Sequence, residues 1–174
     1  MKHLLPSVDS SDHVLGPRSA PIILIEFADF QCPYCGAAYP ELKAVKQAMG
    51  DKLCFVFRNF PLVQSHAHAL QAAEFAETAA SEGKFWQMHD TLFEHQKNLE
   101  EPNLVRYAQR IGLTESTIEC ALRGEFRKKV ESDFDSGKRS GVAGTPWLFV
   151  NGQHWQGPAE AASLLEAFRE AGIG

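Results

Sequence analysis

Apolar residues follow different patterns along this chain, and each pattern predicts a type of element. Residues 21–28 form a nearly continuous apolar run rich in β-branched side chains, which is typical of a central strand covered on both faces. Residues 32–49 carry apolar side chains at helical spacing, and residues 53–60 return to a strand pattern that a proline ends. From about residue 65 to 140 the pattern is that of several helices.

The last part of the chain predicts a hairpin followed by a helix. Residues 145–150 have strand character, Asn151-Gly152 is a strong signal for a two-residue turn, and residues 153–156 form the expected returning strand. A final helix is expected over about 158–171, with a proline in its first turn. The element order is therefore β-α-β, a block of helices, then β-β-α.

This order predicts an α/β fold with a mixed central sheet and an all-α insertion. A helix joins the first two strands, so these strands should be parallel, whereas the hairpin strands are antiparallel. We expect residues 1–64 and 141–174 to form one domain and residues 65–140 to form the helical insertion. The length of 174 residues suits this single-domain arrangement.

Composition and charge exclude several classes of protein. The formal net charge is −5 and the seven histidines are scattered, which argues against a nucleic-acid partner. No apolar run reaches the roughly 18 residues typical of a membrane helix, so we expect no membrane insertion. The N-terminus lacks the apolar run of roughly 7–15 residues found in signal peptides, which favours a cytoplasmic location, or a periplasmic or secreted one if truncation removed a leader.

Cys32 and Cys35 form a C-x-x-C pair where the first strand ends and the first helix begins, a position where functional groups collect in open α/β sheets. Such a pair can bind a metal, form a structural disulfide or act as a redox centre. A structural zinc site normally needs four ligands, and the remaining candidates are isolated: Cys54, Cys120, His66 and His68. A disulfide across so short a loop restrains the unfolded chain very little.

The redox interpretation has a positive physical basis. Cys32 falls at the helix N-terminus, where unpaired backbone N–H groups and the helix dipole favour a thiolate, and Pro33 fits the first helical position. Thiols of C-x-x-C pairs in such settings have pKa values lowered to roughly 3.5–7.5. Cys35, one turn further on, can then resolve a mixed disulfide formed at Cys32.

Two further features have both an ordinary and a functional interpretation. Glu26 interrupts the apolar run of the first strand, either as a strand-edge acid in contact with solvent or as a buried carboxyl that accepts the proton of Cys35. Pro146 begins the hairpin strand, where proline is often an edge feature, but an X-Pro bond such as Thr145-Pro146 is also where a cis peptide costs least.

Several motifs resemble those of the thioredoxin superfamily, specifically its DsbA-like thiol:disulfide oxidoreductases. The motifs are EFADFQCPYC, Pro40 inside the first helix, FWQMHDTLF and GVAGTPWLFVNG, and the resemblance runs from Asp12 to the C-terminal helix. It implies a thioredoxin fold with a helical insertion. It also implies that Thr145-Pro146 is cis and lies against the cysteine pair, and that Glu26 occupies the buried acid position.

The resemblance implies disulfide exchange with protein or small-molecule thiols. The expected redox group is the Cys32–Cys35 disulfide with no further cofactor, and glutathione or another thiol redox protein is a candidate partner. The dipeptide between the cysteines is Pro-Tyr, as in glutaredoxins, and not the Pro-His of DsbA. We therefore expect a reduction potential nearer the glutaredoxin range, about −200 to −230 mV, than the value of about −120 mV for DsbA.

A client-contact surface is predicted around the pair, made of Phe30, Pro33, Tyr34, Gly144 and Trp147, with the backbone of Thr145 pairing with an extended client segment. Cys54 and Cys120 are expected to be small buried apolar residues. Two alternatives to an oxidoreductase remain open at this point. One is a metal-binding module that uses the cysteine pair, and the other is a non-catalytic, chaperone-like interaction domain on the same fold.

Overall fold

A five-stranded mixed sheet forms the centre of the molecule in the computed structural model, which describes residues 3–173. The strand order is β1-β3-β2-β4-β5, with β2 and β3 parallel and every other neighbouring pair antiparallel. The strands are β1 (His13–Leu15), β2 (Ile22–Ala28), β3 (Leu53–Asn59), β4 (Trp147–Val150) and β5 (Gln153–His154). This mixed sheet with its helices confirms the predicted fold class.

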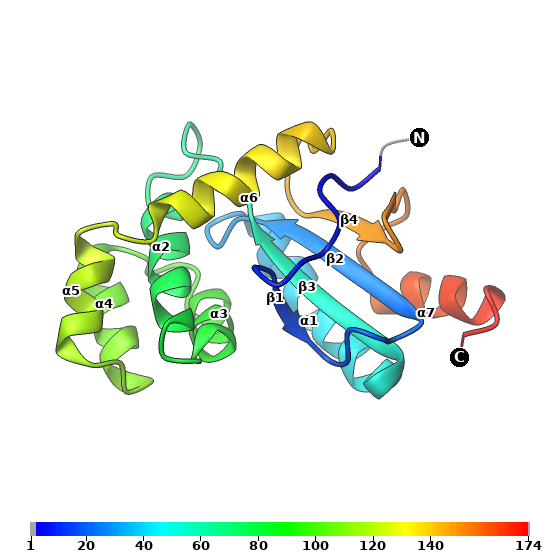
Figure 1. The fold of residues 1–174 in the computed structure, drawn as a ribbon, viewed down its shortest axis with the longest axis horizontal. Helices are drawn as coiled ribbons and strands as arrows, with labels where there is room; N and C mark the ends of the chain where they lie inside the picture. The colour runs from blue at the N-terminus through cyan, green and yellow to red at the C-terminus, as the bar shows by residue number, and fades with distance from the viewer. Residues whose placement is uncertain (1–2, 174) are drawn as a thin grey trace.

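Two helices pack on one face of the sheet, and the remaining α-helices lie between β3 and β4 in the chain. Helices α1 (Pro33–Met49) and α7 (Ala161–Glu170) contact each other, and Figure 1 shows α1 behind the sheet and α7 at the right. A short 3-10 helix, η1 (Gly50–Lys52), joins α1 to β3. The remaining helices all lie between residues 65 and 140: α2 (Ala69–Ala80), α3 (Phe85–Glu94), α4 (Glu101–Arg110), α5 (Glu115–Leu122) and α6 (Arg127–Arg139). The outermost residues that we assigned to the main domain, 1, 2 and 174, lie outside the described residues.

The two faces of β2 follow from the alternation of side chains along a strand. Leu24 and Ala28 belong to the main core, which includes Leu42 and Val45 of α1. Ile25 and Phe27 belong to a second core on the opposite face, which is closed by α6 and by the N-terminal segment that crosses the front of the sheet in Figure 1. Glu26 has the same parity as Leu24 and Ala28, so it faces α1.

The helical insertion is anchored to the end of β3 by buried polar groups. The Asn59 side-chain amide donates to Glu77 Oε1 of α2 at 2.6 Å and to Asp133 Oδ2 of α6 at 3.0 Å. All three residues are at least 96% buried. In Figure 1 helices α2–α5 gather at the left, the side toward which β2 and β3 run, so the insertion stands next to the strand ends that carry the candidate site.

The hairpin prediction is confirmed, but β5 is shorter than expected. Asn151 and Gly152 both have positive φ values, 48° and 79°, as a two-residue turn of this type requires. The Asn151 carboxamide oxygen also accepts a hydrogen bond from Ile23 N at 2.8 Å, which ties the turn to β2. Only residues 153 and 154 pair as strand β5, because the chain then leaves the sheet to form one wall of a cleft.

The C-terminal helix begins later than its sequence pattern predicts. Pro158 precedes the helix and is not in its first turn; its carbonyl instead accepts a hydrogen bond from Trp155 Nε1 at 3.0 Å. Helix α7 starts at Ala161, whose N–H donates to the Glu41 carboxylate of α1 at 2.8 Å.

Strand β1 carried too short a pattern to be predicted. No helix within residues 3–173 combines the length and apolar character needed to cross a membrane.

Candidate active site

Cys32 is the N-cap residue of α1, and Pro33 occupies the first turn. The polypeptide leaves β2 at Ala28 and turns at once, because Cys32 N donates to the Asp29 carbonyl at 3.1 Å. This turn holds Cys32 above the N-terminus of α1. The Cys32 sulfur lies 3.5 Å from the Thr145 carbonyl oxygen, which places the segment before β4 directly against it. None of the four cysteines, all in the described part of the chain, is in a disulfide.

The two thiols of the pair differ strongly in acidity. The Cys35 thiol donates to the Cys32 sulfur, and with the backbone N–H groups of Tyr34 and Cys35 it lowers the pKa of Cys32 to about 5 against the opposing effect of burial. Cys35 is fully buried, and burial raises its pKa well above the usual thiol value, with further increases from the hydrogen bond to Cys32 and from Glu26. At neutral pH Cys32 is therefore a thiolate and Cys35 a thiol.

Glu26 lies in the core below the pair and has no solvent contact to stabilise its charge. The residue is 2% exposed, and its Oε1 has no hydrogen-bond partner among the described residues. Burial raises the pKa of this carboxyl to about 8, with a smaller opposing effect of Lys46 and a smaller increase from Cys32. The strand-edge interpretation of Glu26 is therefore wrong, because the side chain is not in contact with solvent. A desolvated carboxyl with a pKa near neutrality can both take up and release a proton.

The Thr145–Pro146 peptide bond is cis in the structure. The Thr145 hydroxyl is buried and has no partner among the residues described, and it can donate to the Cys32 thiolate and lower the pKa of that thiol further. Pro146 directly follows Thr145, whose carbonyl contacts Cys32, so the proline is close to the cysteine pair although it is more than 100 residues away in the chain. Pro146 also lines a cleft.

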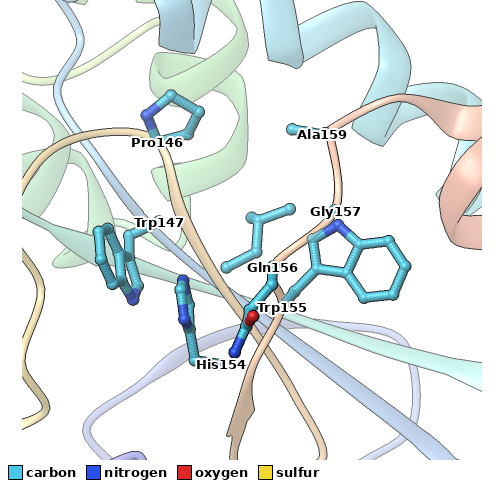
Figure 2. Close-up of a pocket in the computed structure, with 8 residues that line it drawn as sticks. Pro146, Trp147, His154, Trp155, Gln156, Gly157 and Ala159 are labelled. Atoms are coloured by element: carbon cyan, nitrogen blue, oxygen red, sulfur yellow. The ribbon is translucent and has the colours of Figure 1, made fainter. Parts of the chain in front are cut away.

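An open cleft of about 770 Å³ begins at Pro146 and runs along β4. Figure 2 shows the Trp147 and His154 rings stacked on one side of it and Trp155 on the other, and the stacked centroids are 4.2 Å apart. Gly157 is needed at the far wall, because a Cβ there would lie 2.5 Å from the Trp155 ring. The remaining lining residues are Leu148, Gln156 and Ala159. The cleft thus offers flat aromatic surfaces next to the reactive thiol.

Four of the five predicted client-contact residues can be reached from outside, but Phe30 cannot. Pro33 and Tyr34 are exposed, the latter at 76%, and Gly144 and Trp147 are half-buried. Phe30 is 1% exposed and packs in the core between the rings of Phe57 and Phe93, with centroids 5.1 and 5.0 Å away. The prediction of a client contact for Phe30 is wrong, because its side chain points inward and belongs to the contact between sheet and insertion.

The two other cysteines differ from each other. Cys54 is 1% exposed in β3, which confirms that it is a buried apolar residue. Cys120 is partly exposed on α5, and Arg123 Nη2 lies 3.5 Å from its sulfur, so the prediction of burial is wrong there. The apolar residues of α5 face α2, whereas Cys120 lies beside the charged surface of the helix. No group of three or more potential metal ligands gathers within residues 3–173.

Sequence reasoning missed the polar contacts that hold the loop before Cys32. Asp29 is 1% exposed and accepts hydrogen bonds from Gln31 N at 2.7 Å and Leu62 N at 2.8 Å, and His66 Nδ1 lies 2.7 Å from the same carboxylate. An acid directly after a buried strand was a visible signal. No comparable signal marked Gln96, which contacts the same loop from the insertion. The same is true of the cleft residues His154 and Trp155.

A thiol of lowered pKa at a helix N-terminus, a buried acid below it and a proline loop beside it come together on a thioredoxin-like fold. The model of the family described as Thioredoxin matches residues 9–169, and the chain belongs to this family. A thioredoxin-like oxidoreductase from Silicibacter pomeroyi is 25% identical, with a TM-score of 0.80 over 95% of each chain. BdbD from Bacillus subtilis is 24% identical, with a TM-score of 0.81 over 94% of each chain. The fold is that of DsbA-like thiol–disulfide oxidoreductases.

Curated relatives with higher identity are much longer proteins. Na(+)/H(+) antiporter NhaA 3 of Salinispora tropica is 42% identical over 97% of this chain and 26% of its own length. Na(+)/H(+) antiporter NhaA 1 of Mycolicibacterium vanbaalenii is 39% identical over 99% of this chain and 28% of its own length. The chain thus spans about a quarter of the length of these relatives.

Proposed function

We propose that this chain is a thiol–disulfide oxidoreductase in which Cys32 is the attacking thiol and Cys35 the resolving thiol. The observation that carries the proposal is the placement of the pair: Cys32 is the N-cap residue of α1 and Cys35 is fully buried one turn on, which lowers the pKa of Cys32 to about 5 and strongly raises that of Cys35. A thiolate is the nucleophile in disulfide exchange, and a thiol of low pKa is also the better leaving group. Cys32 is suited to both steps.

When the pair acts as a reductant, the Cys32 thiolate attacks one sulfur of a client disulfide and expels the other as a thiolate. Cys35 then loses its proton and attacks Cys32 Sγ, which expels the second client thiolate and leaves a Cys32–Cys35 disulfide. The client gains two electrons, and oxidation of a client dithiol is the reverse sequence. The direction of the reaction depends on the reduction potential of the pair relative to that of its client.

Glu26 is the proposed proton acceptor for Cys35 in this sequence. Its carboxyl has a pKa of about 8 in a site that excludes solvent, so both protonation states are accessible near neutral pH. In the reducing direction the carboxylate takes the Cys35 proton before the resolving attack, and in the oxidising direction the carboxylic acid returns it to the Cys35 thiolate as that sulfur leaves. No further cofactor is needed for either direction.

Clients are proposed to bind along the segment before β4. Gly144, Thr145 and Pro146 lead from the Cys32 thiol to the aromatic cleft, and an extended client segment can pair with the Thr145 backbone while a neighbouring side chain enters the cleft. Tyr34, which is 76% exposed and lies two residues after Cys32 in the chain, can add a second apolar contact near the thiol. Protein or small-molecule thiols fit this open arrangement, and glutathione or another thiol redox protein is the proposed recycling partner.

The antiporter relatives point to a partner and leave the proposed chemistry unchanged. They match 97% and 99% of this chain but carry about three quarters of their length outside the match, as the covered shares of 26% and 28% indicate. We infer that a Na(+)/H(+) antiporter is a candidate client of this chain. Formation of a mixed disulfide between the purified antiporter and Cys32 tests this inference.

Trapping experiments test the assignment of the two thiols. A Cys35→Ser variant should accumulate mixed disulfides with glutathione or a peptide disulfide, because the resolving thiol is missing, whereas Cys32→Ser should form none. Both variants should carry Cys120→Ser, since Cys120 is partly exposed and can react on its own. Trapping by Cys32→Ser alone would reverse the assignment, and stoichiometric zinc in the purified protein with no trapping by either variant would favour the metal-binding alternative.

A further inference from the structure

One side chain of the helical insertion is hydrogen-bonded to the loop that carries the reactive thiol. Gln96 lies in the connection between α3 and α4, and its Nε2 donates to the carbonyl of Phe30 at 2.9 Å and to that of Cys32 at 2.7 Å. The two acceptors lie on either side of Gln31. A single amide group therefore fixes the backbone on both sides of the turn that presents the thiol.

The first turn of α1 is shaped to admit this amide. A Cβ at Gly36 would lie 2.2 Å from Gln96 Oε1, so any larger residue at this position must displace the amide. The φ angle of Gly36 is not in the left-handed region, which means that glycine is needed here for space and not for backbone conformation. Gly36 N also donates to the Cys32 carbonyl at 3.0 Å, so this carbonyl accepts from the helix and from Gln96 together.

The position of the Cys32 backbone determines which protein groups can donate hydrogen bonds to its sulfur. The sulfur accepts hydrogen bonds from the Cys35 thiol and from the N–H groups of Tyr34 and Cys35, all of which belong to the first turn of α1. Because the side chain is attached to this backbone, a rotation of the Cys32 peptide changes the position of the sulfur relative to these donors.

We propose that Gln96 is a positioning residue that holds Cys32 over the N-terminus of α1 and so makes the helical insertion a determinant of thiol reactivity. This inference rests on the proposed disulfide exchange at Cys32. It assigns to the insertion a direct effect on the redox centre, through one side chain and without any contact with the client.

The test is the pH dependence of Cys32 alkylation in Gln96→Ala, with the label located by mass spectrometry and Cys120→Ser as the common background. Without Gln96 the Cys32 backbone is less well held against its hydrogen-bond donors, which should raise the midpoint by about half to one pH unit, so that alkylation below the midpoint slows by about three- to tenfold. A less stable thiolate makes the reduced form of the pair less stable. The same three- to tenfold change in the redox equilibrium constant lowers the reduction potential by about 15–30 mV.

A double-mutant cycle with Gly36→Ala separates this effect from a general loss of structure. Gly36→Ala leaves Gln96 in place but pushes its amide off the loop, so it should shift the midpoint in the same direction as Gln96→Ala. In the Gln96→Ala background the added methyl group has no amide to displace, and the further shift should vanish. Gln87→Ala, a change at an exposed position of α3, is the matched control and should leave the midpoint unchanged.

A midpoint in Gln96→Ala equal to that of the parent protein would overturn the proposal, even if the variant is less stable. If Gln96→Ala does not fold, Gln96→Met keeps the bulk of the side chain, removes the donors and should give the same shift. Failure of the proposed function itself looks different, because the parent protein would then show an ordinary thiol midpoint and no exchange with glutathione. A low parent midpoint that both variants retain refutes the role of Gln96 alone.

Discussion

Replacement of Glu26 by glutamine removes the buried acid while keeping its shape, and the structure sets the size of the effect on stability. The residue is 2% exposed, and burial raises the pKa of its carboxyl from 4.5 to about 8. Each pH unit between these two values costs the native protein about 1.4 kcal/mol relative to the unfolded chain, in which the carboxyl ionises freely. The accumulated cost at pH 7 is about 3 kcal/mol.

The sign of the pH dependence follows from which state holds the proton. The native protein keeps Glu26 protonated up to about pH 8, whereas the unfolded chain releases the proton above 4.5, so the native state binds more protons in this window and its stability falls as the pH rises. Glutamine does not titrate. The variant should therefore match the parent protein near pH 4.5 and be the more stable of the two by about 3 kcal/mol at pH 7.

Urea unfolding of both proteins at several pH values between 5 and 8, under reducing conditions, measures this difference directly. Glu166→Gln, at an exposed position of α7, serves as the control for loss of a surface carboxylate. Turnover with a disulfide client should fall in Glu26→Gln because Cys35 loses its proton acceptor. A stability difference that does not change with pH would refute the raised pKa, and unchanged turnover between pH 6 and 8 would refute the proton-transfer role.

Three further predictions concern the thiols, the core and the cleft. Alkylation of Cys32 in the reduced protein should have a midpoint near pH 5, and Cys35 should stay unlabelled until the protein unfolds; equal labelling of both at pH 7 contradicts the difference in acidity. Phe30→Ala should lower the free energy of unfolding by about 3–5 kcal/mol in urea titrations, against about 0.5 kcal/mol or less for the exposed Tyr34→Ala. Trp155→Ala should raise KM for a peptide disulfide without moving the Cys32 alkylation midpoint, and an unchanged KM would remove the cleft from the client site.

Local patterns in the sequence determined the elements and the reactive residues. The apolar run of β2 and the helical spacing of α1 are periodic signals that depend on neighbours only a few residues away. The turn at Asn151 requires positive φ values that few residue types adopt, so its sequence is specific. Cys32 and Cys35 could be assigned as a redox pair because the helix start that activates the thiol lies in the same stretch of chain.

Local patterns did not determine which residues surround the thiol and which face inward, although the family resemblance already implied that Thr145-Pro146 lies against the cysteine pair. Gln96 reaches Cys32 across 64 positions, and Thr145 reaches it across 113, and neither partner follows from a local pattern. The burial of Phe30 depends on aromatic rings supplied by β3 and α3, and the start of α7 depends on a carboxylate of α1. Secondary structure is set largely by short-range sterics and periodicity, whereas a side chain's environment is set by how elements distant in sequence pack together, and only the folded chain brings them into contact.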